Sequence, residues 1–143
     1  RLETIVEMIL TEQYQNLPPS YGVAWYGTRY YVIGWAAILP GYRKPCEEHD
    51  FAQLLLNLEM LAPFKRVREG KWFKDNMEYL EQFRTPKGTY LFPRSWLSEK
   101  KNGYWVGGAY TGYDERDRGE ECIEYESTFR VLLIKKRVGL LPD

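Results

Sequence analysis

Cysteine and histidine are nearly absent from this chain, and neither sign of charge dominates it. Its 143 residues include two cysteines, one histidine, 20 basic and 20 acidic side chains. Two cysteines are too few for a disulfide scaffold, and one histidine supports no convincing Ser-His-Asp or Cys-His arrangement. We therefore expect a reducing, cytoplasmic setting, although a single bridge between Cys46 and Cys122 stays open.

Long apolar runs and a surplus of positive charge are lacking as well. No stretch approaches the ~18 apolar residues of a membrane helix, so we expect no membrane span. The formal net charge of zero argues against nucleic acid as a partner, because dedicated nucleic-acid binders usually carry a basic excess. No phosphate loop or dinucleotide fingerprint is present, and we expect no cofactor.

Aromatic residues, in contrast, are abundant. They make up 16% of the chain, with 12 Tyr and 5 Trp, and hydrophobic residues reach 44%. That is enough apolar material for the core of one ordinary domain, which we expect to cover residues 1–143. The aromatic surplus still has to be placed, either in the core or on a binding surface.

Apolar residues recur at helical spacing in four segments. This spacing predicts helices over residues 2–17, 51–61, 71–83 and 129–138. Asp50 is expected to cap the second helix, and Ser127 or Thr128 the last. Gly139 is the expected end of the chain's last helix.

The segments between these helices are rich in aromatic residues and predict loops. In residues 21–42 we expect a loop followed by a short helix over 30–39. Residues 89–92 and 104–106 suit one short β-hairpin. The fold class predicted from the sequence is therefore all-α, with long aromatic-rich loops.

Residues 79–90 resemble the repeat signature of squalene-cyclase and prenyltransferase-like α/α toroids. In that signature, the end of a helix is followed by a Gln, any three residues, a Gly, any one residue and a Trp. Arg84, Gly88 and Tyr90 stand at the Gln, Gly and Trp positions. The resemblance implies helical hairpins of the α/α-toroid type, in the C-terminal portion of a longer bacterial protein. It also implies that Tyr90 folds back against the end of the third helix, and that the upstream part of the same protein is a partner.

The activities of the toroid enzymes do not carry over to this chain. The Asp-rich protonating motif of terpene cyclases is missing. For the zinc site of prenyltransferases the only loose analogue is Glu120-Glu121-Cys122, and no His follows it. Cys46 to Asp50 together with Cys122 would offer zinc ligands, but no paired Cys spacing supports them, so we expect a polar turn and no metal.

The glycine- and aromatic-rich segment 103–116 is the candidate binding loop, with a small molecule or a glycan as the expected ligand. Glycines permit tight turns there, and Tyr and Trp rings offer flat apolar faces. The expected ligand contacts are Tyr104, Trp105, Tyr110, Tyr113, Arg116 and Arg130. For Arg130 an ion pair with Glu126, one helical turn away, is the simpler interpretation.

Three functions stay open at this point, and the sequence leaves undecided whether the protein is an enzyme. The first is a toroid-like helical domain that binds a ligand through its aromatic loops. The second is part of a carbohydrate- or isoprenoid-active enzyme with Asp114, Glu115 and Glu126 as acid and base, although such charge runs are more often solvated loops. The third is a protein-interaction module that presents its aromatic loops to a partner.

Overall fold

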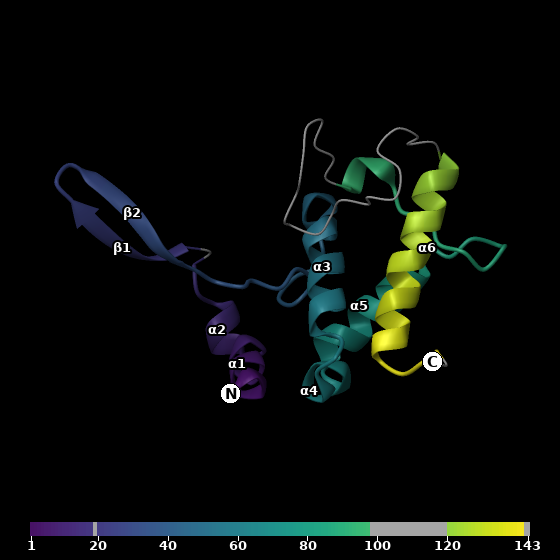
Figure 1. Ribbon diagram of the computed structural model, residues 1–143, viewed down its shortest axis with the longest axis horizontal. Coiled ribbons are helices and arrows are strands. Elements are labelled where there is room, and N and C mark those ends of the chain that lie inside the picture. The colour runs from purple at the N-terminus through teal and green to yellow at the C-terminus, as the bar shows by residue number, and fades with distance from the viewer. Residues whose placement is uncertain (19, 98–119, 142–143) are drawn as a thin grey trace.

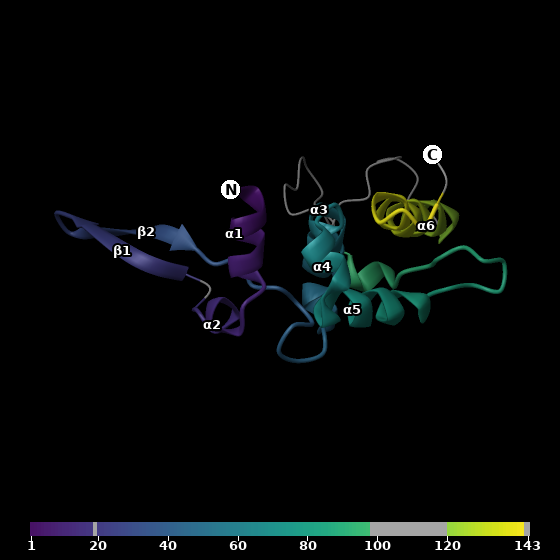
Figure 2. The ribbon, with the colours of Figure 1, turned by 90° about the horizontal axis from the view of Figure 1, so that it is seen from below.

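A projecting β-hairpin and a body of helices make up the protein (Figure 1). The computed structural model describes residues 1–18, 20–97 and 120–141. The N-terminal part contains α1 (Leu2–Ile9), α2 (Glu12–Gln15), β1 (Ser20–Tyr26) and β2 (Arg29–Trp35). The body contains η1 (Glu48–Asp50), α3 (Phe51–Leu61), α4 (Lys65–Glu69), α5 (Lys71–Glu81), η2 (Arg94–Trp96) and α6 (Glu120–Arg137). Figure 2 shows the hairpin and α6 at opposite ends of the molecule.

The prediction of an all-α chain is wrong, because β1 and β2 form a two-stranded antiparallel sheet. The strands occupy the segment for which a loop and a short helix over 30–39 were predicted. The structure instead places a two-residue turn at Gly27 and Thr28, between two stretches rich in aromatic and β-branched residues. The hairpin predicted from 89–92 and 104–106 lies partly outside the described residues. Within them, Tyr90 forms a single β-bridge with Arg84.

The predicted helices over 51–61 and 71–83 are confirmed, as α3 and as the slightly shorter α5. The predicted helix over 2–17 is wrong as one element. It divides into α1 and α2, and the Thr11 side chain caps α2 by accepting the N–H of Tyr14 at 3.2 Å. Asp50 precedes α3 but makes no side-chain cap hydrogen bond, because the 3-10 turn η1 leads into the helix. The short helix α4 was not predicted.

The start predicted for the last helix is wrong, because α6 already begins at Glu120. Ser127 and Thr128 therefore lie inside the helix and cap nothing. The Ser127 hydroxyl accepts the N–H of Phe92 at 3.1 Å, and the Thr128 hydroxyl accepts the N–H of Tyr90 at 2.9 Å. The predicted end is confirmed, with Gly139 at a φ of +77° just after the helix.

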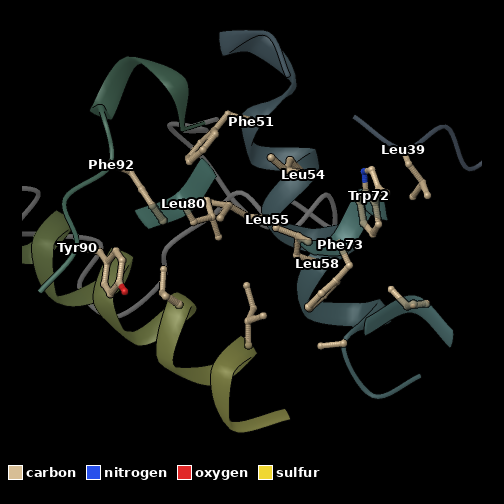
Figure 3. Close-up of a cluster of buried hydrophobic side chains, with 14 of the residues drawn as sticks. Leu39, Phe51, Leu54, Leu55, Leu58, Trp72, Phe73, Leu80, Tyr90 and Phe92 are labelled. Carbon is tan, nitrogen blue, oxygen red and sulfur yellow. The ribbon is translucent and has the colours of Figure 1, made fainter. Parts of the chain in front are cut away.

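Phe51, at the start of α3, is the centre of an aromatic cluster within the buried core that Figure 3 shows. Its fully buried ring makes edge contacts with Phe92, Phe83 and Trp96 at centroid distances of 4.9, 5.3 and 5.5 Å. The leucines of α3 continue this cluster toward α5 and α6. Among the described residues of the body, Phe51, Trp72, Phe73, Tyr90 and Phe92 are buried, whereas Tyr125 and Phe129 on α6 are exposed.

We predict that Phe51→Ala lowers the free energy of unfolding by about 3–5 kcal/mol, because it empties the centre of this cluster. Urea unfolding followed by circular dichroism measures the change. The control is Tyr125→Ala on α6, where the ring is exposed and the expected loss is below about 0.5 kcal/mol. Equal losses in the two variants would contradict the central position of Phe51.

Candidate interaction surface

The hairpin, here called the aromatic arm (residues 20–35), is built around a tight turn. Tyr26 pairs with Arg29, so Gly27 and Thr28 alone connect the strands. Gly27 has a φ of +62°, and no residue other than glycine has a positive φ in the described part of the chain. A positive φ at the first turn position only is the type II′ geometry, whose twist matches that of the two strands. The turn fixes the register, and the register decides which side chains share a face.

The first face of the aromatic arm carries Val23, Trp25, Tyr30 and Val32. Trp25 and Tyr30 are cross-strand partners, with ring centroids 5.7 Å apart and planes tilted by 52°. Trp25 is 70% exposed and Tyr30 is 65% exposed, so the two rings cover each other only in part. This face is apolar and open to solvent.

The second face of the aromatic arm is also aromatic and exposed. It carries Tyr26, Tyr31 and Trp35, which are 82%, 50% and 71% exposed. Arg29 lies on the same face and is the only charged residue of the arm. Antiparallel sheets commonly pack one face on the core and leave the other in water. Here neither face is covered by the described part of the chain.

Side-chain hydrogen bonds hold the arm's C-terminal end to α2. The buried Gln15 amide donates to the carbonyls of Ile9 (2.8 Å) and Ala37 (3.1 Å) and accepts the N–H of Leu39 at 2.8 Å. The Tyr14 hydroxyl accepts the N–H of Ala37 at 3.1 Å. The arm is therefore fixed at its base while its strands extend into solvent.

Helix α1 adds a second exposed apolar surface at the same end of the chain. Val6 is buried in the core, whereas Leu2, Ile5 and Met8 are 70%, 50% and 49% exposed. An amphipathic helix normally buries its whole apolar stripe. In α1 only one edge of the stripe is buried, and Leu2, Ile5 and Met8 stay open to solvent in the described part of the structure.

A hollow of about 600 Å³ lies where the arm joins the body. Leu17, Ile38 and Pro40 line it with apolar surface, and its charged lining residues are Arg43, Lys44 and Asp50. None of its described lining residues belongs to the aromatic arm.

The predicted ligand contacts Tyr104, Trp105, Tyr110, Tyr113 and Arg116 lie outside the described residues. The same holds for Asp114 and Glu115, two of the three candidate catalytic carboxylates. The ligand loop and the acid–base pair therefore stay predictions.

The other two predicted site residues, Arg130 and Glu126, both lie on α6. Glu126 is buried, with 3% of its surface exposed. Arg130 donates from Nη1 to Oε2 of Glu59 on α3 at 2.8 Å, and the carbonyl of Glu59 accepts a hydrogen bond from Arg137 at 2.6 Å. In the described part of the structure, Arg130 thus joins α6 to α3, which is a structural role.

Tyr90 folds back onto the end of the third predicted helix, as expected. Its hydroxyl lies 2.8 and 2.9 Å from the two carboxylate oxygens of Glu81, the last residue of α5, and its ring is buried. Lys135 of α6 contacts both groups, at 2.6 Å from the Tyr90 oxygen and 2.6 Å from Glu81. Burial alone would raise the pKa of Glu81, but the hydrogen bonds from Lys135 and Tyr90 outweigh it and lower that pKa. The cluster ties α5, the 84–92 segment and α6 together.

The segment from Cys46 to Asp50 forms a polar turn that leads into α3. Cys46 and Cys122 are not joined by a disulfide. Burial, followed by the charges of Asp50 and Glu47, raises the pKa of Cys46 to about 11, so the thiol stays protonated at neutral pH. A metal prefers the thiolate as its ligand. No group of three or more Cys, His, Asp or Glu in the described residues could hold a metal ion.

None of the helices in the described ranges combines the length and the apolar character that crossing a membrane requires. Comparison with known proteins adds no relative, since no protein-family model, curated protein or solved structure matches this chain. The resemblance to α/α toroids therefore stays a prediction.

We predict that Glu81→Gln destabilises the protein at pH 7 by up to about 1 kcal/mol, the upper range for exposed ion pairs. Since the pKa of Glu81 is lower in the folded protein than in the unfolded chain, its contribution is present above the unfolded value. It is lost as the pH falls through the folded pKa.

The measurement is urea unfolding of the wild type and Glu81→Gln between pH 7 and pH 3. The difference between them should shrink toward the acidic end. Glu78→Gln on the exposed side of α5 is the matched control, with a small difference at every pH. A difference for Glu81→Gln that is constant with pH would show that the carboxylate charge contributes nothing there.

Proposed function

We propose that the protein is a protein-interaction module and that its aromatic arm is buried against another protein surface. The observation that supports this is the exposure of five aromatic rings over both faces of one hairpin. Together these rings offer on the order of 600 Å² of exposed surface, divided between the two faces of the hairpin, and the largest apolar patch of a typical monomer is about 300–600 Å². Patches of that size usually mark interaction sites.

A protein surface fits the aromatic arm better than a glycan does. Sugar binding combines an aromatic platform with several directional hydrogen bonds from neighbouring polar side chains. Near the turn, Thr28 and Arg29 are the polar side chains besides the tyrosine hydroxyls. A glycan also stacks on one face of a platform, whereas the arm is apolar on both.

The glycan- or small-molecule-binding loop around Trp105 remains a separate proposal, since it lies outside the described residues. The α/α-toroid resemblance adds the upstream part of the same protein as one source of a protein surface. We also propose the cytoplasm as the location, in line with the expectation of a reducing setting from the low cysteine content.

The experiment is site-specific photo-crosslinking in cells that produce the full chain. A photoreactive phenylalanine analogue replaces Tyr26 or Tyr31 on the aromatic arm, and Tyr125 on α6 in the control. All three side chains are exposed by half or more. We expect both arm positions to give the same protein adduct, identified by mass spectrometry, and the control to give none of it.

The proposal fails if the arm positions yield no protein adduct, or only the adducts that Tyr125 also gives. An adduct that contains carbohydrate alone would support the glycan alternative instead.

A further inference from the structure

We infer that the aromatic arm also pairs with a second copy of this chain, through the outer edge of β2. The inference goes beyond the proposed function, because pairing at a strand edge leaves both faces of the arm open to another protein surface. Two antiparallel β2 strands, one from each copy, would convert two hairpins into one four-stranded sheet.

The outer edge of β2 has backbone groups available for such a pairing. The two-residue turn makes Tyr26 and Arg29 a hydrogen-bonded pair, so alternate residues of β2 point their N–H and C=O groups toward β1. Tyr30, Val32 and Gly34 point theirs the other way. No third strand joins the sheet in the described part of the chain. A regular strand edge of this kind, without proline or lysine, is a template for another strand.

The sequence of β2 is complementary to itself when two copies meet about a two-fold axis at Val32. Val32 then faces its own equivalent, and Tyr30 faces Gly34 of the second copy in both directions. These three positions are the ones with outward backbone groups, so about six hydrogen bonds form across the axis. The Tyr30 ring also covers the backbone of the glycine, which has no side chain of its own.

The same register gives Arg29, the only charged residue of the arm, a favourable position. Arg29 lies opposite Trp35 of the second copy, at a position without backbone hydrogen bonds, where side chains approach most closely. A guanidinium over a Trp ring is a favourable cation–π contact. The two Arg29 side chains lie at opposite ends of the pairing, so like charges do not meet.

The edge of β1 is less suited to this pairing. Gly22 in the middle of β1 has a φ of +73°, outside the extended range, and bends that edge. In β2 no residue with a positive φ is found.

A second copy also supplies the additional strands that the aromatic arm lacks. An isolated two-stranded hairpin is marginally stable in water, and three or more strands or a covering helix are needed. Two arms joined at β2 provide four strands. An isologous pairing about a two-fold axis closes after two copies, which matches the commonest oligomer symmetry.

The experiment is sedimentation equilibrium from about 1 to about 100 µM, a range that resolves micromolar dissociation constants. We expect the wild type to approach twice the 17.0 kDa of one chain. Val32→Pro removes the central outward N–H and should weaken dimerisation at least about tenfold, while the hairpin ladder keeps its own bonds. The matched control is Val23→Pro, at the cross-strand partner position of β1, with a dissociation constant within about twofold of the wild type.

An NMR contact between Trp25 and Tyr30 reports whether the arm stays formed in each variant. Amide hydrogen exchange in the wild type needs no substitution. It should show protection of Tyr30, Val32 and Gly34 that grows with protein concentration, and none at Val23.

A wild type that is monomeric throughout, or a dimer that survives Val32→Pro with unchanged exchange at Val32, overturns the inference. So does a dimer lost in Val23→Pro alone. If crosslinking from the arm finds a different protein and the chain is monomeric, the interaction module stands and the second copy does not. If neither adduct nor dimer forms, both proposals fail.

Discussion

A two-stranded sheet has no interior of its own, so the hairpin cannot bury its own aromatic side chains. Side chains on both faces of such a sheet stay in water unless another surface covers them. In the aromatic arm, Trp25 and Tyr30 on one face and Tyr26, Tyr31 and Trp35 on the other are exposed by half or more. Leaving this much aromatic surface in water forgoes the hydrophobic free energy that its burial would release.

The body of helices supports the arm without covering it. Phe51 and the aromatic rings around it belong to the core that α3, α5 and α6 share, to which α6 adds Ile123, Val131 and Ile134. Gln15 then holds the connection after β2 through hydrogen bonds with Ala37 and Leu39, and a third bond joins it to Ile9 of α1. The arm is therefore carried by an independently packed domain, which is the arrangement that an interaction module requires. The exposed stripe of α1 extends the same end of the molecule.

The helices of the body could be predicted because their signals are local. The leucines of α3 recur at helical spacing, and Gly139 marks the end of α6. The start of α6 was missed because Glu120 and Glu121 belong to a charge run that suits a loop. Acidic residues also suit the first turn of a helix, where the dipole is positive. Ser127 and Thr128 were misread as caps because their true partners, the N–H groups of Phe92 and Tyr90, are distant in sequence.

The aromatic arm could not be predicted from periodicity, because alternation of apolar and polar residues requires one wet face. In β2 both faces are apolar, so the alternation is absent. The local signal was the turn, with Gly27 and one further residue between two aromatic and β-branched runs. Nothing in a single sequence reveals that these rings remain exposed in the folded chain.

Oxidative footprinting of tryptophan tests the central claim, the burial of the arm against protein, most directly. Hydroxyl radicals are applied to cells that produce the chain and to the purified protein at high dilution. Trp72, buried in the core, is the internal reference and should be protected in both samples. Our account predicts that Trp25 and Trp35 are protected in cells and oxidised at high dilution. Equal oxidation of these two rings in both samples would contradict it.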